Sequence, residues 1–303
     1  MTRKPNLRCS MKQPRPSCAS SGATGWSAEL PAMAYLIPTD RRTTMKRILQ
    51  ILALLCLTLP GTATAVADTA QKTVLITGAN RGIGFEFVKQ YADKGYRVIA
   101  TCRNPDGATE LNRFAKSHPG VIVETLDLID LDGIDTLAKK YAGQPIDVLV
   151  SSAALMRGPD KEQTFGSLDF GDWFDRFFYT NVRGPTKVAE AFWPNLVASE
   201  NGIAGFLTTG QGKHGIPVLG FAYYKSSKAA MDNMVLDIGR KGKRDGVRAV
   251  TISPGRVATH GEPQTRSMVP IEKSVAGMIA VFDSFPIEKN GSYFRWDGSE
   301  PTP

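Results

Sequence analysis

Six short runs of apolar, mostly β-branched residues recur from residue 69 onward, and they constrain the fold more than any other feature. Each run is apolar at consecutive positions, as expected for strands that are covered by helices on both faces. The segments between them are long enough for helices, and the spacing of roughly 20 to 30 residues through the first four is that of βαβ units. The runs are 73–77, 97–102, 121–126, 146–152, 203–209 and 248–253.

This alternation predicts an α/β fold: a single doubly wound Rossmann-type domain around a mostly parallel sheet of about seven strands. The seventh strand is expected at 292–296, where the short run SYFRW can close the sheet as an edge strand. No repeat at another period suggests a second domain.

Positive charge is concentrated in the N-terminal part of the chain. The 303 residues carry a net charge of +8, from 37 Lys and Arg against 29 Asp and Glu. Nine of these basic residues and two of the acidic ones lie within residues 1–67, which leaves 28 basic and 27 acidic residues in the remainder. The basic character therefore belongs to the leader, and we predict no nucleic-acid partner.

The leader has the organisation of a secretory signal. Residues 45–67 begin with two positive charges, continue with an apolar run at 48–59 and end with small residues before Asp68. The run of about 12 residues is short for a membrane span. Residues 1–44 are rich in Pro, Ser and Arg and are expected to be disordered or upstream of the true start. We predict export of a 68–303 domain, to a periplasmic location; an uncleaved leader would instead anchor it to a membrane, and a non-functional one would leave it cytoplasmic.

Three glycines directly follow the first predicted strand. Gly78, Gly82 and Gly84 have the spacing G-x-x-x-G-x-G and stand where a strand gives way to a helix. This arrangement places backbone N–H groups and a helix N-terminus at the carboxyl edge of the sheet, where a pyrophosphate can bind. The alternative is a glycine-rich turn that binds no ligand.

Two motifs carry a resemblance to a known family. The sequence TGANRGIG at 77–84 and the sequence YYKSSK at 223–228 resemble the glycine motif and the Y-x-x-x-K motif of the short-chain dehydrogenase/reductase family. The similarity extends from about residue 73 to residue 298, and is greatest to the C-factor and carbonyl-reductase-like branch. Only Tyr224 has a lysine four residues later, Lys228, one helical turn away on the same face. We expect that ammonium group to lower the pKa of the phenol.

The resemblance implies roles for further residues. Asn181 corresponds to the asparagine that holds a water in the proton relay, Asp127 to the residue at the adenine amino group, and Thr259, in PGRVAT, to the threonine at the nicotinamide carboxamide. Taken alone, each could be a helix cap or a turn. The implied catalytic residues are Tyr224, Lys228, Thr209 and Asn181, and the implied cofactor-binding residues are Gly78, Asn80, Arg81, Gly82, Ile83, Gly84, Arg103, Asp127, Ala153, Tyr224, Lys228, Pro254, Gly255, Val257 and Thr259.

Two departures from the family pattern put activity in question. Where the family has N-N-A-G, this chain has SSAA at 151–154, so shorter hydroxyl groups must replace the asparagines that brace the central sheet. Where the family has I-S-S-x-x-G, this chain has LTTGQG at 207–212, and aligning the last glycine puts Thr209 in the catalytic serine position. Threonine keeps the hydroxyl but stiffens χ1. A cofactor-binding protein without turnover, regulatory or structural, is the alternative function.

The end of the second predicted strand indicates which cofactor is preferred. Enzymes that use NAD usually place an acid there for the ribose 2′-OH, but this chain has Arg103 and no acid until Asp106. Together with Arg81, it offers two guanidinium groups for a 2′-phosphate. We therefore predict NADP(H), with NAD(H) left open; the alternative is that both arginines are solvated surface residues.

The remaining features are less specific. Three histidines without metal-ligand spacing predict no metal site. The aromatic stretch 170–179 is expected to serve core or interface packing, which leaves a homodimer open. Together the motifs predict an NADP(H)-dependent carbonyl reductase acting on a small-molecule carbonyl or alcohol.

Overall fold

The computed structural model describes residues 71–158, 163–212, 220–259 and 263–300. The predicted leader, both 1–44 and 45–67, lies outside these residues, so its assignments remain predictions.

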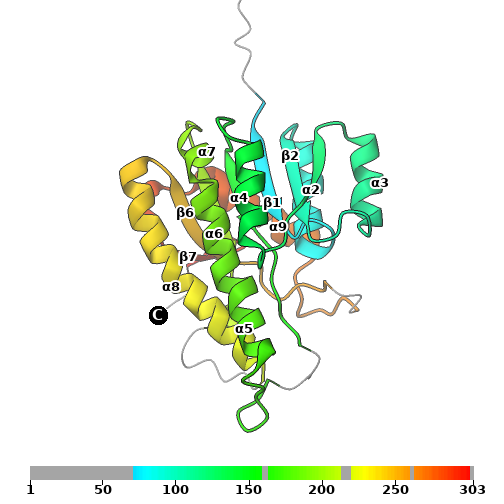
Figure 1. The fold of residues 1–303 in the computed structure, drawn as a ribbon, viewed down its shortest axis with the longest axis vertical. Helices are drawn as coiled ribbons and strands as arrows, with labels where there is room; N and C mark the ends of the chain where they lie inside the picture. Colours follow the sequence, from blue (N-terminus) through cyan, green and yellow to red (C-terminus); the bar gives the residue numbers. More distant parts are fainter. Residues whose placement is uncertain (1–70, 159–162, 213–219, 260–262, 301–303) are drawn as a thin grey trace, which may run out of the picture. The chain divides into compact units, whose positions relative to one another are not determined.

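Seven strands form one sheet that is flanked by helices (Figure 1). Their order is β3-β2-β1-β4-β5-β6-β7, and all six pairings are parallel. The predicted doubly wound fold is confirmed, including the short edge strand at its end. The predicted run 146–152 begins two residues before β4 and ends one residue after it, and the run 203–209 ends two residues after β5, where the chain leaves the sheet at its carboxyl edge. The strands are β1 (Thr73–Thr77), β2 (Arg97–Cys102), β3 (Val121–Thr125), β4 (Val148–Ser151), β5 (Ile203–Leu207), β6 (Arg248–Ser253) and β7 (Tyr293–Arg295).

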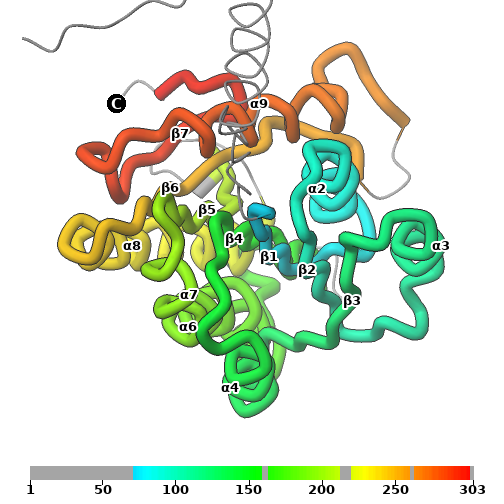
Figure 2. The backbone as a smooth tube through the Cα atoms, turned by 90° about the horizontal axis from the view of Figure 1, so that it is seen from above, coloured from blue at the N-terminus to red at the C-terminus, as the bar shows by residue number. Residues whose placement is uncertain are grey.

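Helices cover both faces of the sheet. Figure 2, which looks along the layers, shows α2, α3 and α9 on one side and α4, α6, α7 and α8 on the other. The α-helices are α2 (Gly82–Asp93), α3 (Thr109–Ser117), α4 (Leu131–Lys140), α5 (Asp172–Phe178), α6 (Gly184–Ala191), α7 (Trp193–Val197), α8 (Ala222–Asp245) and α9 (Ile271–Ser284). A π-helical turn, η1 (Tyr179–Arg183), joins α5 to α6, and two 3₁₀ turns are η2 (Gly210–Gly212) and η3 (Ile287–Lys289).

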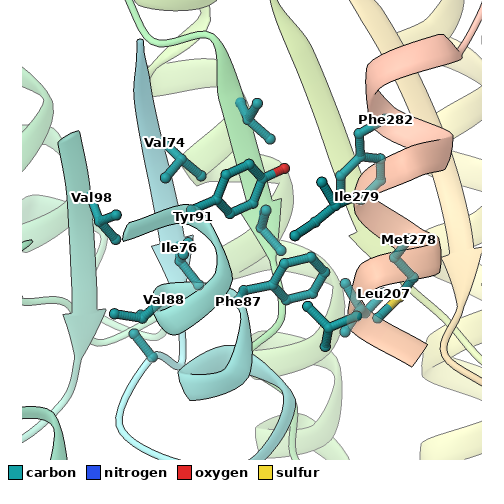
Figure 3. Packing of buried hydrophobic residues seen from close by; sticks show 14 of the residues in the cluster. Val74, Ile76, Phe87, Val88, Tyr91, Val98, Leu207, Met278, Ile279 and Phe282 are labelled. Atoms are coloured by element: carbon teal, nitrogen blue, oxygen red, sulfur yellow. The ribbon is translucent and has the colours of Figure 1, made fainter. Parts of the chain in front are cut away.

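Consecutive residues of β1 pack into two separate cores, which explains why the residues at 74–76 are all apolar. Val74 and Ile76 pack under Phe87 of α2 and Phe282 of α9 (Figure 3). Leu75 points to the opposite face, into the cluster formed with α4, α6 and α8. All five residues of β1 are buried. The three central residues of the strand are therefore all apolar, whereas a strand buried on one face needs an apolar residue only at every second position.

The connections reverse direction at the centre of the sheet. From β1 the chain winds outward to β2 and β3, then returns to place β4 on the other side of β1. In open α/β sheets, ligands bind outside the carboxyl ends of the strands at such a point. A ligand is therefore expected to bind at the loops that follow β1 and β4.

Candidate active site

A cavity of about 530 Å³ lies at the carboxyl edge of the sheet. All the predicted cofactor-binding residues line it: Gly78, Asn80, Arg81, Gly82, Ile83, Gly84, Arg103, Asp127, Ala153, Tyr224, Lys228, Pro254, Gly255, Val257 and Thr259. Of the predicted catalytic residues, Tyr224 and Lys228 line it, whereas Thr209 and Asn181 do not. Six successive strands contribute to the lining, each through a residue at or just beyond its end.

The glycine loop is closely packed at the floor of the cavity. Gly78 has a positive φ of 69°, and a Cβ there would lie 2.8 Å from the Cα of Ala153. At Gly84 a Cβ would overlap the carbonyl group of Gly78. Larger residues would push the first turn of α2 away from β1 and β4. The glycines therefore keep the backbone N–H groups at the N-terminus of α2 accessible from the cavity.

Two guanidinium groups stand at one side of the cavity. Arg81 precedes the first turn of α2, and Arg103 follows β2; both side chains are exposed. Because both are exposed and line the cavity, they are available to an anionic group that enters it.

Tyr224 and Lys228 lie on the first turns of α8, with the Lys228 Nζ 6.0 Å from the centre of the Tyr224 ring. Burial raises the pKa of Tyr224 to about 12, and burial also lowers the pKa of Lys228 to about 8. The expected lowering of the phenol pKa by Lys228 is therefore not found. Burial is the largest cause of the raised pKa of Tyr224, and the charges of Asp232 and Tyr293 add to it. The Lys228 ammonium donates a hydrogen bond of 2.7 Å to the carbonyl of Leu207. Tyr224 is thus protonated at neutral pH.

The low pKa of Lys228 predicts a pH-dependent stability. Between pH 8 and 10.5 the unfolded chain holds a proton on Lys228 that the folded chain lacks, so folding becomes more favourable as the pH rises through this window. We expect Lys228→Met to raise the free energy of unfolding at pH 7 by about 1 to 3 kcal/mol, with the gain vanishing near pH 10.5. Urea denaturation without added cofactor measures this. The exposed Lys243→Met on the same helix is the control, and an equal gain in both variants would contradict the prediction.

Two adjacent threonines follow β5, and their hydroxyl groups differ. Thr208 lines the cavity and is only 3% exposed, and its Oγ1 has no hydrogen-bond partner among the described residues. Thr209 is half-buried, and its Oγ1 accepts a hydrogen bond of 3.3 Å from the backbone N–H of Gln211. A buried hydroxyl without a partner is costly, so the Thr208 side chain is the one that stands ready for a ligand.

A family model described as short chain dehydrogenase matches residues 72–269. The chain belongs to the short-chain dehydrogenase family. The predicted family is thereby confirmed, and the match covers the sheet from β1 to β6.

The alignments with individual relatives cover nearly the whole length of those relatives. An uncharacterized oxidoreductase of Schizosaccharomyces pombe is 30% identical over 255 residues, which cover 77% of this chain and 98% of that protein. The 1-hydroxy-2-glutathionyl-2-methyl-3-butene dehydrogenase of Rhodococcus sp. is 31% identical over 233 residues, covering 75% and 97%. Among solved structures, the NADPH-bound carbonyl reductase from chicken fatty liver has a TM-score of 0.71 at 26% identity, covering 77% and 99%.

In this dehydrogenase Asn181 braces the cavity wall. It lies in the π-helical turn η1, fully buried. Its Oδ1 accepts a hydrogen bond from the N–H of Leu155 at 2.7 Å, and its Nδ2 donates to the Leu155 carbonyl at 2.8 Å and to the Ser227 hydroxyl at 2.9 Å. The side chain is therefore occupied by protein groups.

The SSAA segment is braced by a hydroxyl from another strand. Thr77 at the end of β1 accepts hydrogen bonds from the N–H groups of Ser152 and Ala153, at 3.1 and 3.2 Å. We expected the serine hydroxyls to replace the family's asparagines, but this bracing comes from Thr77 and uses only their backbone. This bracing therefore does not depend on an asparagine side chain in the segment.

Several residues of the cavity lining belong to no motif and were not predicted from the sequence. Met156 follows β4, Trp173 and Arg176 lie on α5, and Thr180 lies on η1. Trp173 packs on Gly158 and lies under the Arg176 guanidinium, 5.3 Å from the ring centre. The spacing of three and four residues between Trp173, Arg176 and Thr180 marks one helical face, and was the available signal.

Within the described part of the chain, no group of three or more His, Cys, Asp or Glu is placed to hold a metal ion. In the same part, no helix has the length and apolar character that a membrane crossing requires.

Proposed function

We propose that this short-chain dehydrogenase is an NADP(H)-dependent oxidoreductase that reduces the carbonyl group of a small molecule. The observation that carries the proposal is that Tyr224, Lys228 and the unpartnered hydroxyl of Thr208 line the same cavity as the glycine loop. A proton donor, a cation and a hydroxyl group thus line the same cavity as a binding site for a dinucleotide.

The cavity offers partners for two charged parts of NADP(H). The glycine loop and the N-terminus of α2 suit the pyrophosphate, and the exposed Arg81 and Arg103 suit the 2′-phosphate that distinguishes NADPH from NADH. The chicken reductase, similar over 77% of this chain, is described with NADPH bound. When bound, the cofactor supplies the hydride for the carbonyl carbon.

Protein groups supply the proton and orient the substrate. Tyr224, protonated at neutral pH because burial raises its pKa to about 12, donates its proton to the carbonyl oxygen. The Thr208 hydroxyl donates a hydrogen bond to the same oxygen and holds the carbonyl in place. Lys228 stabilises the negative charge that develops on the phenol oxygen.

The walls of the cavity favour a substrate with an apolar body. Leu155, Met156 and Trp173 line it on the side of the β4–α5 connection. A panel of aliphatic and aromatic aldehydes and ketones, followed by the loss of NADPH absorbance, tests the proposal. We expect turnover of at least one apolar carbonyl compound. NADPH binding without consumption across the panel would instead favour the cofactor-binding protein without turnover.

Removing one guanidinium group tests the choice of cofactor. Arg103→Ala deletes a charge-assisted partner of the 2′-phosphate, and we expect NADPH affinity to fall by roughly 10- to 100-fold, equivalent to about 1.5 to 3 kcal/mol, with little change for NADH. Fluorescence titration measures both affinities. Arg113→Ala, on the exposed face of α3, is the control and should affect neither cofactor. Equal losses for NADPH and NADH would contradict the assignment.

We also propose export, on the basis of the leader sequence alone. The mature protein is expected to begin at Asp68 and to be recovered from the periplasmic fraction of its native host. N-terminal sequencing of the fractionated protein tests this. Recovery of a chain that retains residues 45–67 in the cytoplasm would overturn it.

A further inference from the structure

The helix that carries Tyr224 begins without a cap of its own. The residue before α8 is Phe221, which has a positive φ of 55° and a side chain that cannot accept a hydrogen bond. A helix start leaves its first N–H groups without intrahelical partners. At α8 these groups belong to the turn that holds the proton donor, so whatever binds them also fixes Tyr224.

Gln163, from the connection between β4 and α5, supplies the missing partners. Its backbone carbonyl accepts a hydrogen bond from the Ala222 N–H at 2.9 Å, and its Oε1 accepts one from the Tyr224 N–H at 3.1 Å. Its Nε2 donates to the carbonyl of Met156 at 3.0 Å. The side chain is only 4% exposed, which is unusual for glutamine. Since one amide end faces a donor and the other an acceptor, a single orientation of the amide satisfies both.

These bonds join the catalytic helix to the cavity wall. Met156 lines the cavity on one side and Tyr224 lines it on another, and Gln163 bridges their backbones with one side chain. A buried polar bridge of this kind keeps its geometry because each lost bond leaves a buried group unpaired. The glutamine side chain thereby links the backbone of the first turn of α8 to the backbone at Met156.

We propose that Gln163 is a positioning residue for the reduction: it holds the first turn of α8 so that the Tyr224 hydroxyl meets the substrate carbonyl. The inference rests on the proposed function, because it assigns Tyr224 the proton transfer. Gln163 itself does not reach the reacting atoms. Its effect is on the placement of the donor, where errors of about 1 Å are costly to the rate.

Two substitutions separate the bonds that Gln163 makes. Gln163→Met keeps the length and removes both polar ends. Gln163→Glu keeps the acceptor for the Tyr224 N–H, next to the helix N-terminus, and loses only the donor to the Met156 carbonyl. We expect Gln163→Met to lower kcat by roughly 10- to 100-fold and Gln163→Glu to stay within about five-fold of the parent, with the NADPH Kd unchanged in both. Gln144→Met, which loses the bond to Arg97 remote from the cavity, should leave kcat unaltered.

Hydrogen exchange gives a readout that does not depend on turnover. In the full chain with NADPH, the amides of residues 222–228 should exchange faster in Gln163→Met, and at the parent rate in Gln163→Glu. A parent protein that reduces no carbonyl while these exchange rates follow the expectation would defeat the proposed function and leave the bridge intact. Unchanged exchange and kcat in Gln163→Met, equal damage from both substitutions, or a parallel loss of NADPH affinity would overturn the role of Gln163.

Discussion

Tyr224→Phe is expected to lower kcat for carbonyl reduction by at least about a hundredfold while the Kd for NADPH changes by less than about two-fold. The substitution removes the proton donor and leaves the ring, which with its neighbours forms part of the cavity lining. No other group identified in the cavity combines a phenol with the adjacent buried ammonium of Lys228. Steady-state kinetics together with a fluorescence titration of NADPH measure both quantities.

Tyr223→Phe is the matched control on the same turn. Tyr223 is 5% exposed, packs its ring against Phe174 and Phe177, and donates its hydroxyl hydrogen to the carbonyl of Asp169. It faces the connection before α5 and is absent from the cavity lining. We expect a small loss of stability and a kcat within about three-fold of the parent. If Tyr223→Phe is the more damaging substitution, the register assigned to the catalytic helix is wrong.

The fold was predictable because strands that are buried on both faces of a parallel sheet have apolar residues at consecutive positions. β1 illustrates this: its neighbours Leu75 and Ile76 belong to different cores, so neither could be polar. The ends of strands were less predictable. Thr208 and Thr209 are β-branched and were included in the predicted strand 203–209, but the chain leaves the sheet after Leu207, and Thr208 lines the cavity.

The cofactor side of the site was also accessible from sequence, since glycines and strand ends occupy fixed places in this topology. The electrostatics were not. The raised pKa of Tyr224 comes first from burial, which depends on every element packed around it and on no residue of its motif. Gln163 was missed for the same reason: it contacts Tyr224 across 61 positions of chain, and no local pattern marks such a contact.

The choice between the two threonines after β5 leads to the second large effect. Thr208→Val preserves the branched shape and removes the hydroxyl that lies unpartnered in the cavity, so we expect kcat to fall by roughly a hundredfold or more. Thr208→Ser should keep activity within about five-fold, because only the hydroxyl is required to act. Thr209→Val is the control, since that hydroxyl accepts a bond from its own turn. Aligning the family motif on its last glycine favours Thr209, whereas the buried, unpaired hydroxyl favours Thr208. The same three variants therefore show which of the two threonines acts.

The free energy of unfolding provides an independent check on Thr208, because a buried hydroxyl that is unpaired without its ligand destabilises the free protein. The Thr208 Oγ1 is buried without a partner among the described residues, so replacing it by a methyl group should leave the free energy of unfolding unchanged or raise it by up to about 1 kcal/mol. Thr209→Val should be slightly destabilising, because it breaks a hydrogen bond. A Thr208→Val protein that is both stable and inactive would identify the hydroxyl as catalytic. A protein that loses stability and activity together would show instead that Thr208 supports the end of β5, and the catalytic hydroxyl would then be that of Thr209.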